Sequence, residues 1–438
     1  MIQKIVRLLC LLILVTNKSY CAKSNYPGSL DRSFGDNGIV ISNNGQLFGV
    51  ATQTSNAIIV AGDNINPSIM VAHAVTIDPT DGDIFLAGSV TNDAGFDNFA
   101  VARLNSAGIL DTNFGALVPN GNGLRTGIAT NSFGATTASQ AQAIALDGTT
   151  LVVGGFAQTA GQQKRFALAR YNISNGALLW QVSVPFTPNS PMEQINSIAI
   201  DRISSPQKIV VAGQSTILNL KRFVLARYNS STGSLDTSFG TNGKTVTDFS
   251  NLTLTSRTDD SAQALVINNN ANGLVPENVG FITAAGYTVN NEGEPFFALA
   301  YYDKDGKPDD SRGTFLGTQI TEIGTISNQA NAMAMYTSGA HAGKIVVVGS
   351  TQTALSKSTS KSNVSCFAVA RYDFNGQLDI TFGDSDGNGQ RTGTVITSFD
   401  AENAIATGVA IDANNRIVVA GYVTRNGEPL MALARYNS

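Results

Sequence analysis

The sequence predicts an all-β protein, a β-propeller of six four-stranded blades in a closed ring. Three observations lead to this prediction: a strand motif that recurs six times, four apolar segments in the same order in each unit, and chain ends that complete one another. Internal repeats of this kind are typical of propellers and other repeat architectures. A seventh, irregular blade stays an alternative, because the first unit is longer than the others.

The repeat is clearest in one strand motif, Phe-Ala-Leu-Ala-Arg-Tyr or a close variant. Its copies lie 57 to 74 residues apart and start at Phe99, Phe166, Phe223, Phe297, Phe367 and Met431. Because side chains alternate along a strand, Phe, Leu and Arg lie on one face and the two Ala on the other. We therefore expect the bulky face of one blade to pack on the small face of the next.

Each unit contains four short segments rich in β-branched and aromatic residues, separated by Gly, Asn and Asp. In the fourth unit these segments are residues 244–249, 262–267, 281–286 and 297–302. Such runs indicate strands joined by hairpins. Four antiparallel strands per unit, repeated radially, are the pattern of a β-propeller.

The two ends of the chain resemble the halves of one linker between repeats. The pattern that is continuous at 227–240 is divided between residues 435–438 and residues 29–35. We therefore expect residues 38–41 to add the outer strand of the last blade. The extra stretch 42–68 in the first unit predicts either an added hairpin or part of a seventh blade.

The first residues indicate a secretory signal peptide. Lys4 and Arg7 precede an apolar run at 8–15, which is shorter than the roughly 20 residues that a membrane span needs. We expect residues 1–21 to be removed and residues 22–438 to form a single propeller domain without a membrane span. The protein would then be exported to the periplasm, the cell surface or the medium.

The amino-acid composition argues against some classes of partner and of chemistry. The 438 residues include 28 Lys and Arg and 32 Asp and Glu, a net charge of −4 that becomes −7 when the leader removes Lys4, Arg7 and Lys18. An acidic chain without a basic cluster argues against nucleic acid as a partner. Only two His are present, and Cys366 would be the one thiol after cleavage. We expect a monomer without an intramolecular disulfide.

The repeat resembles the delta-60 repeat family, a bacterial group described as a β-propeller domain of unknown function. The resemblance covers residues 28–438 and rests on two strand motifs and on the turn Leu-Asp-x-Ser/Thr-Phe-Gly at 30–35, 235–240 and 378–383. It implies an exported propeller and no particular reaction. The departures include irregular third and fifth turns, and Tyr301 in place of Arg.

A column of polar residues in the small-residue strand is the first candidate site. Its members are His73, Gln142, Asn196, Gln263, Asn331 and Thr407. On an innermost strand, these side chains would either bind a small polar ligand or ion, or satisfy buried backbone groups between blades. The sequence leaves both interpretations open.

The Arg of the strand motif has candidate partners in the Asp residues of the turns. The arginines are Arg103, Arg170, Arg227, Arg371 and Arg435, and the aspartates are Asp31, Asp111, Asp236, Asp309 and Asp379. We expect charge-assisted pairs that join strand end to turn. Recurrence in nearly every unit indicates a structural role, since one active site does not need six copies.

Asp384, Asp386 and Asn388 are the candidate metal ligands. Oxygen ligands at positions one, three and five match the start of a Ca²⁺ loop, although Val395 stands at position twelve, where an EF-hand has Glu. The similar loop of the second unit has Val118 at the first position, which favours a plain glycine-rich turn. Ca²⁺ is the one cofactor considered.

These observations predict an exported binding scaffold for a protein or glycan partner, with no catalysis expected. The alternative is a secreted enzyme that acts on carbohydrate, of the glycoside hydrolase or lyase type, which would use paired carboxylates. Asp and Glu occur in loops, but no pair stands out in the sequence.

Overall fold

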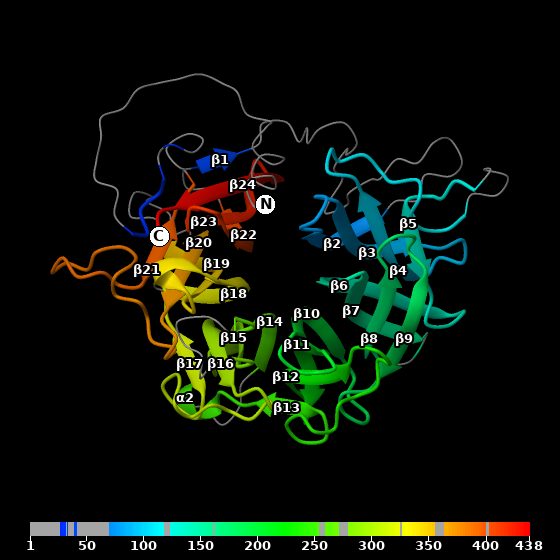
Figure 1. Ribbon diagram of the computed structural model, residues 1–438. Coiled ribbons are helices and arrows are strands. Elements are labelled where there is room, and N and C mark those ends of the chain that lie inside the picture. Colours follow the sequence, from blue (N-terminus) through cyan, green and yellow to red (C-terminus); the bar gives the residue numbers. More distant parts are fainter. Residues whose placement is uncertain are drawn as a thin grey trace. The chain divides into compact units, whose positions relative to one another are not determined.

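The computed structural model describes residues 27–31, 33, 39–41, 70–117, 123–159, 161, 163–253, 259–270, 279–324, 326–354, 363–399 and 403–438. The chain divides into two compact units. Unit N is Leu47–Thr247, and unit C combines Met1–Gln46 with Asp248–Ser438. The described part of each unit contains three four-stranded sheets, called blades below (Figure 1).

Unit N contains blades 1 to 3, each an antiparallel sheet of four consecutive strands. Blade 1 comprises β2 (Met70–Ile77), β3 (Ile84–Thr91), β4 (Asp97–Leu104) and β5 (Ile128–Asn131). Blade 2 comprises β6 (Thr137–Asp147), β7 (Thr150–Thr159), β8 (Arg165–Asn172) and β9 (Leu178–Val184). Blade 3 comprises β10 (Glu193–Asp201), β11 (Lys208–Ile217), β12 (Leu220–Asn229) and β13 (Lys244–Thr247).

Unit C contains blades 4 to 6 and, among its described residues, the short helical turns α2 (Ser250–Thr253) and η2 (Gly339–His341). Blade 4 comprises β14 (Asp259–Ile267), β15 (Ile282–Val289), β16 (Pro295–Tyr302) and β17 (Thr318–Thr321). Blade 5 comprises β18 (Ile326–Met335), β19 (Ile345–Ala354), β20 (Asn363–Tyr372) and β21 (Thr394–Thr397). Blade 6 comprises β22 (Asn403–Ile411), β23 (Ile417–Arg425), β24 (Glu428–Tyr436) and β1 (Ile39–Ile41).

Blade 6 is completed by a strand from the start of the chain. β1 pairs antiparallel with β24, with Ile39 opposite Ala434. The Gly28 N–H also donates to the Asn437 carbonyl over 2.9 Å. The predicted outer strand at 38–41 is therefore confirmed. The predicted signal segment 1–21 and the stretch 42–68, considered for a seventh blade, lie outside the described residues.

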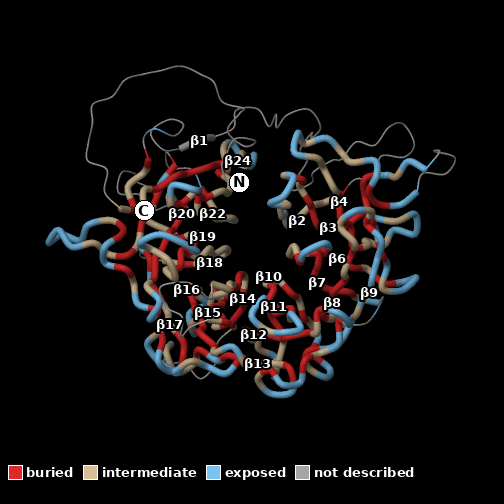
Figure 2. The backbone as a smooth tube through the Cα atoms, in the orientation of Figure 1, coloured by how far each residue is buried: buried red, intermediate tan, exposed pale blue. Residues whose placement is uncertain are grey.

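Neighbouring blades pack a bulky face against a small one, as predicted. Leu168 of β8 packs with Ala226 of β12 in the next blade. On the opposite face of β8, Ala169 packs with Val101 of β4 in the preceding blade. All four side chains are buried, and Figure 2 shows burial along the strands and exposure along many of the connecting loops. The same packing recurs between neighbouring blades of unit C.

The predicted fold class is confirmed: the chain is an all-β propeller, and its described residues form six blades of four antiparallel strands each. Among the described residues, no helix is long and apolar enough to cross a membrane. Cys366 on β20 is buried and forms no disulfide.

Candidate functional site

Each residue of the predicted polar column is the extra residue of a β-bulge. In blade 1, Ala72 lies opposite Gly88 and Ala74 lies opposite Ala87, so the register passes over His73. The first strand of every blade has the same irregularity. The residues passed over are His73, Gln142, Asn196, Gln263, Asn331 and Thr407. A bulge re-aims its extra side chain, so the column has a structural cause.

The bulge also explains the Gly of the repeated Ile-Val-Val-Ala-Gly strand. Gly213 lies opposite Ile195, and a Cβ at this position would overlap the Gln194 carbonyl oxygen. The other blades show the same overlap at Gly88, Gly155, Gly286, Gly349 and Gly421. A residue without a side chain is required because the backbone beside the bulge approaches so closely.

The six bulges form one set of three in each unit. In unit N, β2 contacts β6 and β6 contacts β10; in unit C, β14 contacts β18 and β18 contacts β22. Each of these strands is the first of its blade and is bonded to one neighbouring strand in the sheet order. His73 and Thr407 are exposed and the other four column residues are half-buried. In each unit, at least one side chain of the column is therefore exposed to solvent.

Three column residues have hydrogen bonds that define their local roles. Asn331 donates from Nδ2 to the Ala406 carbonyl over 2.8 Å, which joins blade 5 to blade 6. Gln263 donates to the Ser261 hydroxyl over 2.9 Å on its own strand. Asn196 accepts a hydrogen bond of 2.8 Å from Gln194. Asn331 thus has the structural role that buried polar groups commonly have.

His73 contributes a neutral imidazole to the column. Partial desolvation lowers the pKa of His73, and the nearby Asp97 carboxylate raises it by less. Asp97 accepts hydrogen bonds from the Gln140 amide and the Thr91 hydroxyl. At neutral pH every column side chain is therefore an uncharged hydrogen-bonding group.

The predicted Arg–Asp pairs are confirmed in four blades. The contacts are Arg103–Asp111 at 3.2 Å, Arg227–Asp236 at 2.9 Å, Arg371–Asp379 at 2.7 Å and Arg435–Asp31 at 2.7 Å. The prediction is wrong for Arg170, which contacts Asp147 at 2.8 Å because its blade lacks the turn Asp. It is also wrong for Asp309, because Tyr301 occupies the position of the repeat Arg and the Asp309 Oδ2 atom has no hydrogen-bond partner.

The predicted metal-binding loop forms a turn that also occurs elsewhere in the chain. Asp386 accepts from the N–H groups of Asn388 and Gln390 over 2.9 and 2.8 Å. Asn105 accepts in the same pattern from N–H groups two and four residues later. Since an uncharged Asn forms this turn, the geometry accounts for Asp386 as a turn residue.

Asp384 points to the neighbouring strand. Its Oδ2 atom accepts from the Ile396 N–H over 3.2 Å. Burial raises the pKa of the Asp384 carboxyl, while the hydrogen bond from Ile396 and the charge of Arg391 lower it by less. Within the described ranges, no group of three or more His, Cys, Asp or Glu could hold a metal ion. Calcium binding by Asp384, Asp386 and Asn388 stays a prediction.

Four segments of the chain match the family model described as "Domain of unknown function (DUF5122) beta-propeller". They are residues 80–114, 208–239, 343–382 and 413–438, which lie in blades 1, 3, 5 and 6. Those are the blades in which the repeat Arg contacts the turn Asp. The match, over less than half of the chain, shows a similarity to this β-propeller family of unknown function. The delta-60 name rests on the resemblance alone.

Solved structures similar to this chain have diverse names. A neuraminidase-like protein from A/bat/Guatemala/164/2009 shares 11% identity, over 95% of this chain and 98% of that one, with a TM-score of 0.42. A glucose dehydrogenase shares 10% identity, over 82% and 95%, with a TM-score of 0.41. The periplasmic gluconolactonase of Pseudomonas aeruginosa shares 11% identity, over 89% and 94%, with a TM-score of 0.36. At such values these similarities carry no argument about activity.

A search of curated proteins found no match to the chain.

Proposed function

We propose that the chain is an exported, non-catalytic scaffold that binds a protein or glycan partner, and that a neutral glycan fits its chemistry best. The observation that carries this proposal is the polar side chain at every bulge. Amide, hydroxyl and neutral imidazole groups both donate and accept hydrogen bonds, as sugar hydroxyls require. Export is supported by the charged and apolar order of residues 4–15.

The contacts and the exposure of the column residues separate those with a structural role from those that are available to bind a ligand. Asn331 is engaged with the backbone of the next blade. Thr407, the neighbouring bulge residue in unit C, is exposed. In unit N, Gln142 is half-buried and lies between the bulges of β2 and β10 in strand order. Gln142 and Thr407 are thus the positions to test for binding, and Asn331 supplies the structural control.

A thermal-shift screen over neutral, acidic and sulfated oligosaccharides tests the proposal. We expect a neutral glycan to raise the melting temperature, and Gln142→Ala or Thr407→Ala to weaken its affinity at least tenfold with little change in melting of the free protein. Asn331→Ala should instead lower the melting temperature. Shortening of the bound oligosaccharide would support the alternative carbohydrate-cleaving enzyme, and no response to any glycan would reject the glycan as ligand.

A further inference from the structure

Blade 4 lacks the two cations that meet the turn Asp in blades 3 and 5. In those blades, Lys208 contacts Asp236 at 3.2 Å and Lys344 contacts Asp379 at 2.7 Å, in addition to the repeat Arg. Lys208, Lys344 and Phe281 occupy equivalent positions in their blades. Each directly precedes an Ile that pairs with the Tyr of the strand motif. Blade 4 therefore has Phe281 in place of the lysine. With Tyr301 in place of the repeat Arg, this corner of blade 4 is apolar.

Arg312 supplies a guanidinium to the same corner from the turn after β16. The residue is 6% exposed, so its charge is almost fully buried. The guanidinium lies over the Tyr301 ring, 4.5 Å from the centroid. Its Nε donates to the Phe374 carbonyl over 2.5 Å, the one hydrogen bond that the Arg312 side chain makes within the described part of the chain. The two terminal nitrogen atoms of the guanidinium are therefore available as hydrogen-bond donors.

No carboxylate of the described residues lies within 4.0 Å of Arg312 to form an ion pair. The nearest turn carboxylate, Asp309, accepts instead from the N–H and hydroxyl of Ser311. Burial lowers the pKa of Arg312, and the more distant charges of Asp309 and Asp373 raise it by less. A buried charge without a close counter-charge is costly, which favours an anion at this position.

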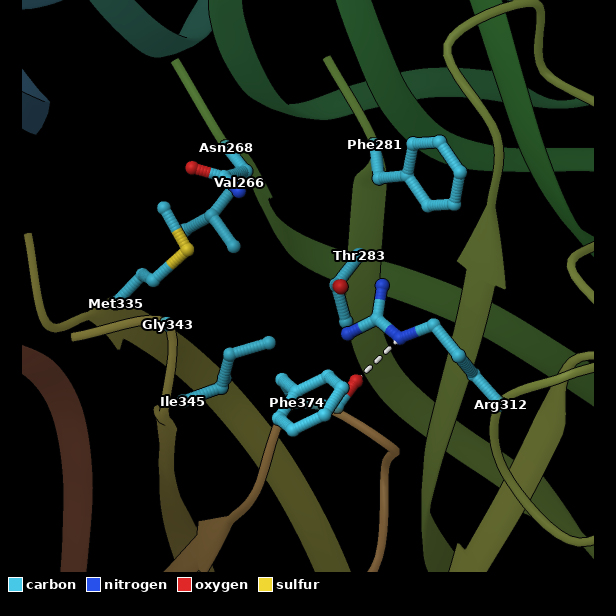
Figure 3. A pocket seen from close by; sticks show the side chains of 9 residues that line it. All are labelled: Val266, Asn268, Phe281, Thr283, Arg312, Met335, Gly343, Ile345 and Phe374. Atoms are coloured by element: carbon cyan, nitrogen blue, oxygen red, sulfur yellow. Dashed lines mark hydrogen bonds between the residues drawn. The ribbon is translucent and has the colours of Figure 1, made fainter. Parts of the chain in front are cut away.

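A small pocket lies beside the Arg312 guanidinium. Its volume is about 20 Å³, and a single water needs roughly 10–15 Å³ on this measure. Figure 3 shows Arg312 reaching toward Thr283 beside Phe374, with Val266 and Met335 across the space. The lining residues are Val266, Asn268, Phe281, Thr283, Arg312, Met335, Gly343, Ile345 and Phe374. The pocket thus combines one buried cation, a hydroxyl and an amide with apolar walls.

We propose that this pocket binds formate, the smallest carboxylate anion. The planar guanidinium matches a carboxylate with two parallel hydrogen bonds. Thr283 supplies a hydroxyl where the equivalent positions of blades 3, 5 and 6 are Val210, Val346 and Val418. A single water molecule would leave part of the volume empty and would leave the Arg312 charge without a counter-ion.

Titration of the full chain with sodium formate, with sodium chloride at equal ionic strength as the reference, tests this proposal. We expect a saturable rise in melting temperature and saturable heat in calorimetry with formate, and at least tenfold weaker binding of butyrate, which is too large for the pocket. Equal effects of chloride and formate would overturn the proposal, because they would show a general salt effect.

Two variants place the binding at this pocket. Arg312→Gln should weaken formate binding at least tenfold, whereas Arg391→Gln, a turn arginine of the same unit that donates to the Gly383 carbonyl, should leave the affinity unchanged. Thr283→Val introduces the residue that sister blades carry, so it should fold and bind formate several-fold more weakly. If Arg312→Gln does not fold, Thr283→Val decides: unchanged formate affinity in that variant would reject the pocket as the site.

Discussion

The Arg435 guanidinium lies 2.7 Å from the Asp31 carboxylate, although the two residues are 404 positions apart in the sequence. Arg416 contacts the same carboxylate at 2.9 Å, and Asp31 and Arg435 are both buried. In the other blades with this pair, the two partners are eight or nine residues apart. In blade 6, the pair between strand and turn is thus one of several contacts that join residues from the two ends of the described chain.

Asp31→Ala is expected to lower the free energy of unfolding by roughly 3–5 kcal/mol, because it removes the carboxylate that the buried Arg435 contacts. Asp305→Ala is the matched control, since its contact with Lys304 is exposed at 2.8 Å and such pairs contribute about 0–1 kcal/mol. Denaturant titration followed by circular dichroism measures both variants. Equal losses in the two would contradict the role assigned to the buried pair.

Gly213→Ala is expected to destabilise the protein by about 1–3 kcal/mol or more, since its methyl group would overlap the Gln194 carbonyl beside the bulge. Gly387 has open space around it, so Gly387→Ala supplies a control at an unconstrained glycine. Thermal melts of the two variants measure the difference. A melting temperature that Gly213→Ala leaves unchanged would mean that the bulge adapts.

Most of the fold was predictable because the repeat places equivalent residues in equivalent environments. The alternation in Phe166 to Arg170 predicted which face meets which neighbour, and the divided linker predicted that residues 38–41 would pair with the last blade. The polar column was also recognised, but its bulge was not. The signal was present in the Gly of the partner strand, such as Gly213, which recurs in every blade opposite the irregularity.

The pocket between blades 4 and 5 was not predictable from the sequence. The pattern showed that Tyr301 replaces the repeat Arg, but not that Arg312 would fold back over the Tyr301 ring. That contact depends on how a turn of irregular sequence packs against the neighbouring Phe374. Side-chain direction in such a turn follows from tertiary packing, which a repeat pattern does not contain.

Ala169→Leu is expected to cost about 1–3 kcal/mol, because the larger side chain overfills the contact between β8 and the preceding blade. Ala226→Leu should behave alike at the contact between blades 2 and 3. Ala94→Leu changes an exposed turn residue and serves as the control. Melting temperatures of the three proteins test the packing, which an unchanged value for both core variants would refute.

Acid should weaken the Arg227–Asp236 pair between about pH 4 and pH 2. Burial alone would raise the pKa of Asp236, but hydrogen bonds from Ser238 and Lys208 and the charge of Arg227 lower it to about 2. Because the folded pKa lies below the unfolded value of 3.8, this carboxylate stabilises the fold above pH 4 and loses that effect as pH falls toward 2. Asp236→Asn should therefore show a smaller fall in melting temperature over this range than the parent protein; equal falls would contradict the assignment.

Calcium is expected to leave the melting temperature unchanged if Asp386 serves only its turn. The neutral Asn105 in blade 1 accepts hydrogen bonds from the equivalent N–H groups of its own turn, so Asp386→Asn should retain the turn and the stability. Asp384→Ala removes the acceptor of the Ile396 N–H and should cost roughly 0.5–1.5 kcal/mol, the usual contribution of one hydrogen bond. Melts of the parent and both variants, with and without millimolar Ca²⁺, separate these roles. A rise in melting temperature with Ca²⁺ that both variants abolish would instead establish Asp384 and Asp386 as ligands, because a turn residue needs no charge and a calcium ligand does.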